Sequence, residues 1–310
     1  MASGGNSIGW IGAGRMGTEM ALRLLRSGCE LAAYNRTEAK LEPLVAAGAK
    51  PVDSIGALAG RDVVFVSVGS SDDLLSVLEG PGGLLTQEAA PSVVIDCSTV
   101  SSEASAHARA LAASRGCAFL AAPVSGNPKV VKAGRLTVAV SGPRASFEDV
   151  RPYLEMLGAG VTYVGDGEAA RLVKLCHNLF LGVVIQSLVE ITVLAEKGGV
   201  ARADFLAFLN DSVMGSTFTR YKTPAIVNLD FKPTFTTKLL RKDFDLGLAA
   251  SRQLEVPMPV AALVHQLVQT GVGEGIGDVD FAALLELQAR ASTMVLESEN
   301  VAVDDGLSAV

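Results

Sequence analysis

The chain has 310 residues and a formal net charge of −7. This length is enough for two ordinary domains, and the negative charge provides no basic field for a nucleic-acid backbone. Hydrophobic residues make up 49% of the chain and aromatic residues only 5%, so Ala, Leu and Val must build most of the core. The composition therefore favours a globular two-domain protein with no nucleic-acid partner.

The cysteines and the N-terminal segment indicate the cellular compartment and whether a metal site is expected. The four cysteines have no paired spacing, and with only three histidines a disulfide framework or a Cys/His metal site is disfavoured. No basic segment precedes an apolar one at the N-terminus, and the most apolar stretch, residues 179–185, is much shorter than a membrane span. We expect a cytoplasmic protein with reduced thiols, no metal and no membrane contact.

Short apolar runs alternate with Ala-rich helical patterns in the first half of the chain. Seven runs are predicted strands, at residues 7–11, 30–34, 63–68, 93–96, 117–121, 136–141 and 161–164. Alternation of this kind predicts right-handed crossovers and a doubly wound, Rossmann-type α/β sheet.

The strand signal stops after Gly165, and the remainder is predicted to be helical. We place residues 1–165 in the sheet domain and residues 166–310 in an all-helical domain. Helix breaks are expected at glycines and prolines, namely Gly198 with Gly199, Pro224, Pro233, and Pro257 with Pro259. The pattern over 166–197 predicts an unusually long interdomain helix, whose apolar face can pack on a partner subunit to form a homodimer or homotetramer. The tail from about 301 is expected to be frayed.

A glycine-rich turn follows the first predicted strand and opens a helical pattern. Its residues are Gly12, Ala13, Gly14, Arg15, Met16 and Gly17. Gly12 permits a tight turn, Gly14 allows backbone to approach a pyrophosphate, and Gly17 allows close helix–sheet packing. We expect a dinucleotide at this helix N-terminus, whereas the alternative is a purely structural glycine turn.

The end of the second predicted strand bears on the choice of cofactor. No carboxylate occurs between residues 31 and 37, where an NAD-selective fold usually places one. Arg36 can bind a 2′-phosphate with paired charge-assisted bonds, and Asn35 and Thr37 can add neutral ones. We expect NADP(H) to be preferred and NAD(H) to be accepted; the alternative is that Arg36 is a solvated turn residue.

Several segments together resemble the β-hydroxyacid dehydrogenase family, which includes 3-hydroxyisobutyrate dehydrogenases and succinic semialdehyde reductases. They are the glycine turn, Asn35-Arg36-Thr37, Asp96-Cys97-Ser98-Thr99, Ala122-Pro123-Val124-Ser125-Gly126, Gly134-x-Leu136-Thr137, Lys174 with Asn178, and Lys242-Asp243. The resemblance spans nearly the whole chain. It implies that Lys174 is the catalytic lysine and that Val68, Thr99 and Lys242 contact the cofactor.

The chemistry of Lys174 agrees with that role. Reduction of an aldehyde requires a proton for the alkoxide that forms as hydride arrives, and a partly buried ammonium can donate it. Lys174 and Asn178 are four residues apart and share one helix face, so both can serve one substrate. The alternative is a surface lysine with no catalytic part.

A second predicted substrate element is the turn formed by Ser125, Gly126 and Asn127. Glycine lets a carboxylate approach backbone N–H groups, and the serine hydroxyl adds a donor; the alternative is a plain turn. Most family members have glycine where Asn127 stands and asparagine where His177 stands. We expect His177 either to contact substrate or to fill a helix interface.

Two further departures from the family precede the lysine, where Glu168 and Ala170 replace glycines. Asp96 is expected to stabilise a strand end rather than to take part in the chemistry. Arg220 and Lys222 either select a second anionic group on the substrate or form a solvated charged turn.

These observations predict an NADP(H)-dependent oxidoreductase with an NADP-binding domain and a helical substrate and oligomerisation domain. It would transfer hydride reversibly between NADPH and a small carboxylate substrate, namely a semialdehyde, glyoxylate or a 3-hydroxyacid. The alternatives are a non-catalytic NADP-binding scaffold and an imine reductase. Lys174 argues against both, because such scaffolds lose the lysine and imine reductases usually replace it with an acid or tyrosine.

Overall fold

The structure is a computed structural model that describes residues 6–307. The described residues form two compact units that divide between residues 174 and 175. The division lies within the long helix, whereas the sequence pattern draws the boundary at Gly165, just before that helix.

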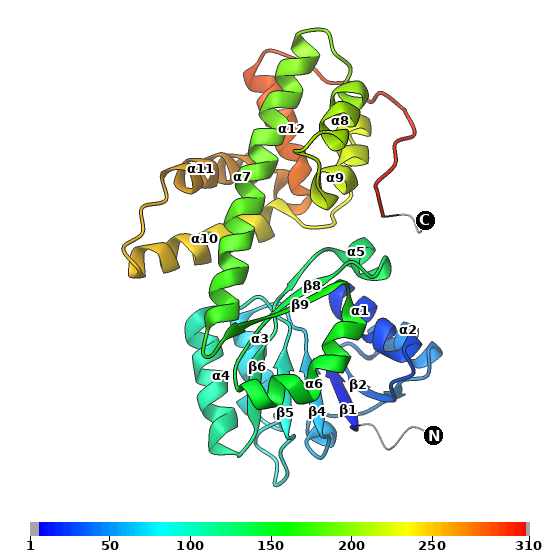
Figure 1. The fold of residues 1–310 in the computed structure, drawn as a ribbon, viewed down its shortest axis with the longest axis vertical. Helices are drawn as coiled ribbons and strands as arrows, with labels where there is room; N and C mark the ends of the chain where they lie inside the picture. Colours follow the sequence, from blue (N-terminus) through cyan, green and yellow to red (C-terminus); the bar gives the residue numbers. More distant parts are fainter. Residues whose placement is uncertain (1–5, 308–310) are drawn as a thin grey trace. The chain divides into compact units, whose positions relative to one another are not determined.

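The first unit is built on one mostly parallel sheet, which confirms the predicted fold class (Figure 1). The strands are β1 (Ile8–Ile11), β2 (Leu31–Tyr34), β3 (Lys50–Pro51), β4 (Val63–Val66), β5 (Val93–Asp96), β6 (Ala118–Ala121), β7 (Val124–Ser125), β8 (Thr137–Ser141) and β9 (Gly160–Gly165). The order is β3-β2-β1-β4-β5-β6-β8-β7, with β9 on β8. The first six strands in this order, from β3 through β2 and β1 to β6, are parallel. Strand β8 runs antiparallel to β6 and β7.

All seven predicted strands are present, and two were missed. The missed strands, β3 and β7, have only two residues each and contain no apolar run that sequence periodicity could detect. Their formation depends on pairing with β2 and β8, which supply the hydrogen-bonding edge.

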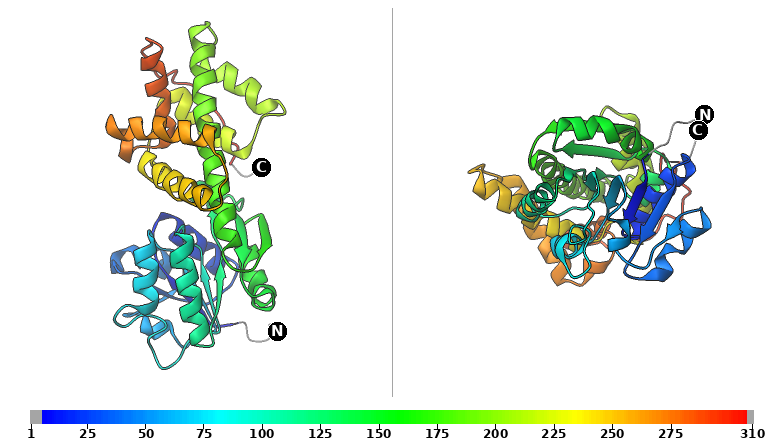
Figure 2. Two further views of the ribbon diagram at one scale, coloured as in Figure 1. Left: turned by 90° about the vertical axis from the view of Figure 1, so that its left-hand side faces the viewer. Right: turned by 90° about the horizontal axis from the view of Figure 1, so that it is seen from below.

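The two faces of the sheet are covered by different helices (Figure 2). The elements are α1 (Arg15–Arg26), η1 (Glu38–Leu41), α2 (Glu42–Ala46), η2 (Gly56–Leu58), α3 (Ser71–Glu79), α4 (Ser102–Ser114), α5 (Pro128–Lys132) and α6 (Arg144–Leu157). Alternate residues along β1 and β4 point to opposite faces. Trp10 and Phe65 stack with ring centroids 5.3 Å apart in the core beneath α1 and α6, whereas Ile11 and Val66 pack beneath α3 and α4.

The second unit is helical, as predicted. Its elements are the greater part of α7 (Ala169–Lys197), then α8 (Arg202–Asp211), α9 (Thr217–Asn228), α10 (Thr237–Gln253), α11 (Pro259–Gly273), η3 (Ile276–Asp278), η4 (Phe281–Ala283) and α12 (Leu284–Ala291). The predicted breaks at Gly198, Pro233 and Pro257 all fall between helices.

Helix α7 is long and apolar enough, by length and composition alone, to cross a membrane, and no other helix among residues 6–307 is. Half of its most apolar window is buried inside the protein, and core helices of soluble proteins have the same character. The apolar segment of α7 is therefore longer than residues 179–185, the most apolar stretch identified in the sequence.

Helices α7 and α10 cross in close contact in the helical unit. A Cβ added to Gly182 would lie 2.1 Å from the Phe244 ring, and one added to Gly247 would lie 2.7 Å from Leu179. The two glycines therefore allow the backbones to approach closely, which brings the helix carrying Asn178 against the helix carrying Lys242.

Two expectations for the helical half are wrong. Pro224 lies inside α9 rather than at a break, because residues on both sides of it are buried and the Thr223 hydroxyl donates to the Thr219 carbonyl oxygen at 2.9 Å. The tail is packed rather than frayed through residue 307. Asn228 bonds both backbone groups of Val301, at 2.8 and 3.0 Å.

Lys222 is not a solvated turn residue but half of a buried ion pair with Asp280. Both side chains are 2% exposed, and Lys222 Nζ lies 2.5 Å from Asp280 Oδ1 and 3.1 Å from Thr234 Oγ1. The ammonium also lies 4.0 Å from the ring centroid of Phe281. This charge is therefore committed to Asp280 rather than open to a substrate anion.

Burial by itself raises the pKa of the Asp280 carboxyl, but the Lys222 ammonium and the hydrogen bonds to the carboxylate outweigh burial and hold the pKa below its usual value. A depressed folded-state pKa stabilises the protein above the unfolded pKa of about 3.9. That stability is lost as the pH falls through the folded pKa.

We predict that Lys222→Met lowers the free energy of unfolding by about 3–5 kcal/mol at pH 7, because it leaves a buried carboxylate unpaired. The difference from wild type should shrink toward acid pH, where protonation neutralises Asp280. Urea unfolding at several pH values measures both effects. Lys232→Met is the control: its exposed pair with Asp230, at 3.4 Å, should contribute less than about 1 kcal/mol. Equal losses in the two variants would contradict the prediction.

Candidate active site

The carboxyl ends of four adjacent strands carry the residues assigned to the cofactor. Gly12 follows β1 and Asn35 follows β2, while Val68 and Thr99 lie just beyond β4 and β5. The strand order reverses at β1, and ligands of doubly wound sheets bind at the carboxyl edge at such a switch point. All four residues lie in the first compact unit, whose last residue is Lys174.

The glycine turn is closely packed on one side and open on the other. Gly12 has φ +102°, and a Cβ there would lie 2.1 Å from the Ser67 carbonyl oxygen. A Cβ on Gly17 would lie 2.2 Å from the Gly12 carbonyl oxygen, whereas one on Gly14 would meet nothing within 4 Å. Gly12 and Gly17 thus close the turn, and Gly14 leaves open space in front of it.

The N-terminus of α1 is suited to an anion. Its N-cap is Gly14, which has no side chain to cap the helix, and the first turn contains no acidic residue. Arg15 is exposed and Met16 packs partly on the core. The free N–H groups and the helix dipole together favour a phosphate here, so the residues fit a dinucleotide.

The side chain of Asn35 forms two hydrogen bonds with backbone groups of nearby loops. Its Oδ1 accepts from the Ala13 N–H at 2.8 Å, and its Nδ2 donates to the Thr37 carbonyl oxygen at 2.8 Å. Asn35 therefore ties the glycine turn to the end of β2 and fixes where Arg36 begins.

Arg36 is 87% exposed and forms an ion pair with Asp73, at 3.4 Å between Nη1 and Oδ1. Asp73 belongs to the first turn of α3 and also accepts a hydrogen bond from the Ser70 hydroxyl at 2.9 Å. Asp73 is not foreseen from the sequence, because it comes from the element after β4 and not from the end of β2, where such folds usually place an acid.

A hydrogen-bonded chain joins the ends of β4 and β5. The Val68 N–H donates to Ser98 Oγ at 2.9 Å, and the Ser98 N–H donates to Asp96 Oδ1 at 3.0 Å. Asp96 is fully buried and stabilises the strand end, as expected. Burial, with a smaller effect of the Asp96 charge, raises the pKa of the neighbouring Cys97 thiol far above its usual value, so this thiol stays protonated.

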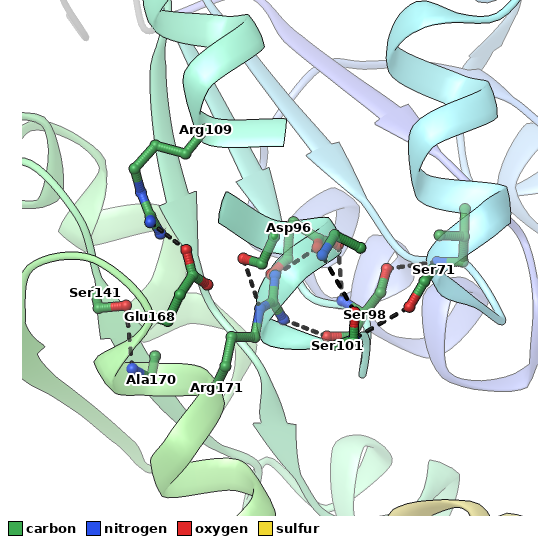
Figure 3. Close-up of polar contacts among 12 residues, drawn as sticks. Ser71, Asp96, Ser98, Ser101, Arg109, Ser141, Glu168, Ala170 and Arg171 are labelled. Carbon is green, nitrogen blue, oxygen red and sulfur yellow. Dashed lines mark hydrogen bonds and ion pairs between the residues drawn. The ribbon is translucent and has the colours of Figure 1, made fainter. Parts of the chain in front are cut away.

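The start of α7 is fixed to the end of β5 by Arg171 (Figure 3). Its Nη2 lies 2.5 Å from Asp96 Oδ2, its Nη1 donates to the Ser98 carbonyl oxygen at 2.5 Å, and its Nε donates to Ser105 Oγ at 3.1 Å. The two charged side chains are 1% and 0% exposed.

A second set of contacts holds the loop that precedes α7. Arg109 pairs with Glu168 and donates to the Gly167 carbonyl oxygen at 2.6 Å. Ser141 Oγ donates to the same carbonyl at 2.8 Å and accepts from the Ala170 N–H at 3.1 Å. The two positions where the sequence departs from family glycines, Glu168 and Ala170, are therefore both part of this junction.

Lys174 follows Arg171 by three residues on α7 and is partly buried. Residues three apart on a helix are neighbours on one face. Lys174 is also the last residue of the unit that contains the glycine turn and Thr99.

The predicted substrate turn lies between β7 and α5. Gly126 has φ +142°, which favours glycine, and Asn127 caps α5 by accepting from the Val130 N–H at 3.0 Å. Asn127 is 5% exposed, and its Nδ2 is buried without a hydrogen-bond partner among the described residues. Ser125 is half-buried at the end of β7.

In the helical unit, Asn178 is the centre of a polar chain. Its Nδ2 donates to Asp243 Oδ2 at 2.5 Å, and its Oδ1 lies 2.9 Å from His177 Nδ1. A carboxylate can only accept, so the amide nitrogen faces Asp243 and the amide oxygen faces the imidazole. Lys242 is 37% exposed and lies 3.5 Å from Asp243. His177 and Lys242 are thereby joined through Asn178 and Asp243.

Arg171 and Asp243 have no role predicted from the sequence. Arg171 resembles an ordinary helix residue in sequence. The available signal was its place in the first turn, where a cation opposes the helix dipole. Asp243 follows the recognised Lys242, but only the crossing of α7 and α10 brings it to Asn178.

Two known protein families match this chain, one over each half. Residues 7–165 match the family described as the NAD binding domain of 6-phosphogluconate dehydrogenase, and residues 167–288 match the family described as NAD-binding of NADP-dependent 3-hydroxyisobutyrate dehydrogenase.

Individual relatives cover nearly the whole chain. It is 34% identical over 282 residues to 2-(hydroxymethyl)glutarate dehydrogenase of Eubacterium barkeri, covering 90% of this chain and 94% of that protein. It is 32% identical to glyoxylate/succinic semialdehyde reductase 1 of Arabidopsis thaliana, covering 90% and 97% of the two. A crystal structure of 3-hydroxyisobutyrate dehydrogenase from Salmonella typhimurium is similar with a TM-score of 0.82 and 25% identity, over 91% and 99% of the two chains.

The first unit is therefore an NAD(P)-binding domain, and the chain belongs to the 3-hydroxyisobutyrate dehydrogenase-like β-hydroxyacid dehydrogenase family of NAD(P)-dependent oxidoreductases.

Proposed function

We propose that this oxidoreductase reduces a small aldehyde that carries a carboxylate, or oxidises the matching 3-hydroxyacid, with Lys174 as the proton-transferring group and NADP(H) as the preferred cofactor. The observation that carries the proposal is the attachment of the helix bearing Lys174 to the carboxyl end of β5, beside Thr99. We also propose that the enzyme is soluble and acts in the cytoplasm.

The chemistry divides between the cofactor and the chain. When bound, the cofactor supplies or accepts the hydride at the nicotinamide ring. In reduction, the Lys174 ammonium donates a proton to the carbonyl oxygen and becomes a neutral amine; in oxidation, the neutral amine takes the hydroxyl proton. The ammonium also stabilises the negative charge that develops on the oxygen.

The turn after β7 is the proposed holder of the substrate carboxylate. The positive φ of Gly126, at +142°, and the hydroxyl of Ser125 suit a turn that binds a carboxylate oxygen. The buried Nδ2 of Asn127 has no acceptor within the described residues, and a buried donor without an acceptor is costly. A ligand carboxylate that approached with a small shift of this turn would satisfy it.

We further propose that the helical unit self-associates into a homodimer or homotetramer. Phe180, Ile191 and Leu194 are 69%, 39% and 71% exposed. Their spacing along α7 places them on one helix face, and an exposed apolar patch marks an interaction surface. We predict a dimeric or tetrameric mass in light scattering. A monomer at micromolar concentration would contradict this part of the proposal.

The catalytic role has a direct test. We predict that Lys174→Ala lowers kcat by about a thousandfold, because general acid catalysis contributes up to about four decades of rate. NADPH oxidation is measured with glyoxylate, succinic semialdehyde and a panel of small hydroxyacids.

Lys197→Ala, at the other end of α7, is the matched control and should leave kcat unchanged. Wild-type turnover by Lys174→Ala would refute the proposed role. Absence of turnover by the wild type on the whole panel would favour a scaffold, and turnover only on cyclic imines would favour an imine reductase.

The cofactor preference is tested by a pair of variants at the adenosine end. We predict that Arg36→Ala raises the KM for NADPH roughly tenfold, because it removes charge-assisted bonds to the 2′-phosphate, and changes the KM for NADH little. Asp73→Asn should lower the KM for NADPH about threefold, because its carboxylate repels the phosphate and competes for Arg36. Steady-state kinetics with both cofactors measures the two ratios. Equal effects on NADPH and NADH would contradict the assignment.

A further inference from the structure

We propose that Arg171 is a positioning residue for Lys174: it fastens the first turn of α7 to the carboxyl end of β5, and so fixes the amine relative to Thr99. This inference rests on the proposed role of Lys174 and adds a residue that acts through it.

All three guanidinium nitrogens of Arg171 donate to an acceptor. The guanidinium is paired with the fully buried Asp96 carboxylate, and it donates to the Ser98 carbonyl oxygen and the Ser105 hydroxyl. A longer contact, 3.5 Å, reaches the Asp96 carbonyl oxygen. Its planar fork thus contacts a strand end, the loop beyond that strand and helix α4, which a flexible ammonium could not do at once.

Local helix energetics do not explain an arginine at this place. Arg171 is the third residue of α7, where the positive end of the helix dipole disfavours a cation. Removing a guanidinium from water is also costly, and a buried ion pair often contributes no net stability over apolar residues. The feature that the arginine supplies is geometry rather than helix stability.

The geometry connects the cofactor edge with the lysine. Arg171 holds the Ser98 carbonyl, which belongs to the peptide group joining Ser98 to Thr99, while Ser98 Oγ accepts from the Val68 N–H. Lys174 lies one turn after Arg171 on the same helix face. A slide or rotation of this first turn would therefore displace the amine from the residues at the ends of β4 and β5.

The test uses the charge-neutral double variant Asp96→Asn with Arg171→Gln, since removing both charges avoids leaving one buried and unpaired. We expect kcat to fall about 10- to 100-fold, the cost of a small misplacement of a catalytic group. NADPH binding, followed by fluorescence titration, should stay close to wild type.

The decisive readout is the primary isotope effect on kcat with NADPH deuterated at the transferred position. A misplaced acid slows the chemical step, so hydride transfer limits turnover more and the isotope effect rises. Partial unfolding would lower kcat through a smaller active fraction and leave the isotope effect unchanged.

The neighbouring neutral double variant, Arg109→Gln with Glu168→Gln, is the matched control. It loosens the loop before α7 but leaves the contacts between Arg171 and β5, so the isotope effect should match wild type. Arg171→Lys is a second test that keeps the charge pair while losing the fork, and it should also raise the isotope effect.

A lowered kcat with an unchanged isotope effect in the Arg171 variants would overturn the proposal, as would wild-type kinetics in a folded Arg171→Lys. An equal rise in the Arg109 control would also overturn it. Failure of the underlying function is distinguishable, because Lys174→Ala would then keep wild-type turnover.

Discussion

The buried ion pair between Arg171 and Asp96 is the interaction on which the rest of the candidate site depends. Two charges that are almost fully removed from water require near-complete hydrogen bonding, and here each finds it at the junction between β5 and α7. The pair joins the last strand end of the cofactor edge to the first turn of the helix that carries Lys174. The position of the lysine within its unit follows from this junction.

The cofactor edge obeys a different constraint, which is steric. Gly12 and Gly17 are forced by contacts of about 2 Å that any side chain would make, whereas Gly14 faces open space. The same loop therefore combines two glycines that close the fold with one that leaves room for a ligand. Asn35 completes the turn by bonding backbone on both sides of it.

The positions that depart from the family pattern each form a hydrogen bond or ion pair. Glu168 pairs with Arg109 through its side chain, a contact that glycine could not make. The bond at position 170 is donated by the backbone N–H to Ser141, so it does not depend on the alanine side chain. His177 is oriented by Asn178, which is itself oriented by Asp243. Asn127 both caps α5 and keeps a buried amide donor.

The sequence by itself determined the fold class, the seven longer strands, the long helix and the glycine turn, because each is encoded by local periodicity or by a motif within one βα unit. Its assignments to Lys174, Ser125 and the other site residues stay predictions. Only the tertiary structure decided what depends on distant partners: the two-residue strands β3 and β7, the continuation of α9 through Pro224, and the burial of Lys222 against Asp280. It also decided the pairings of Arg171 with Asp96 and of Arg36 with Asp73. The physical reason is that burial and ion pairing are properties of the surroundings, which are assembled from segments far apart in the chain and leave no periodic mark in any one of them.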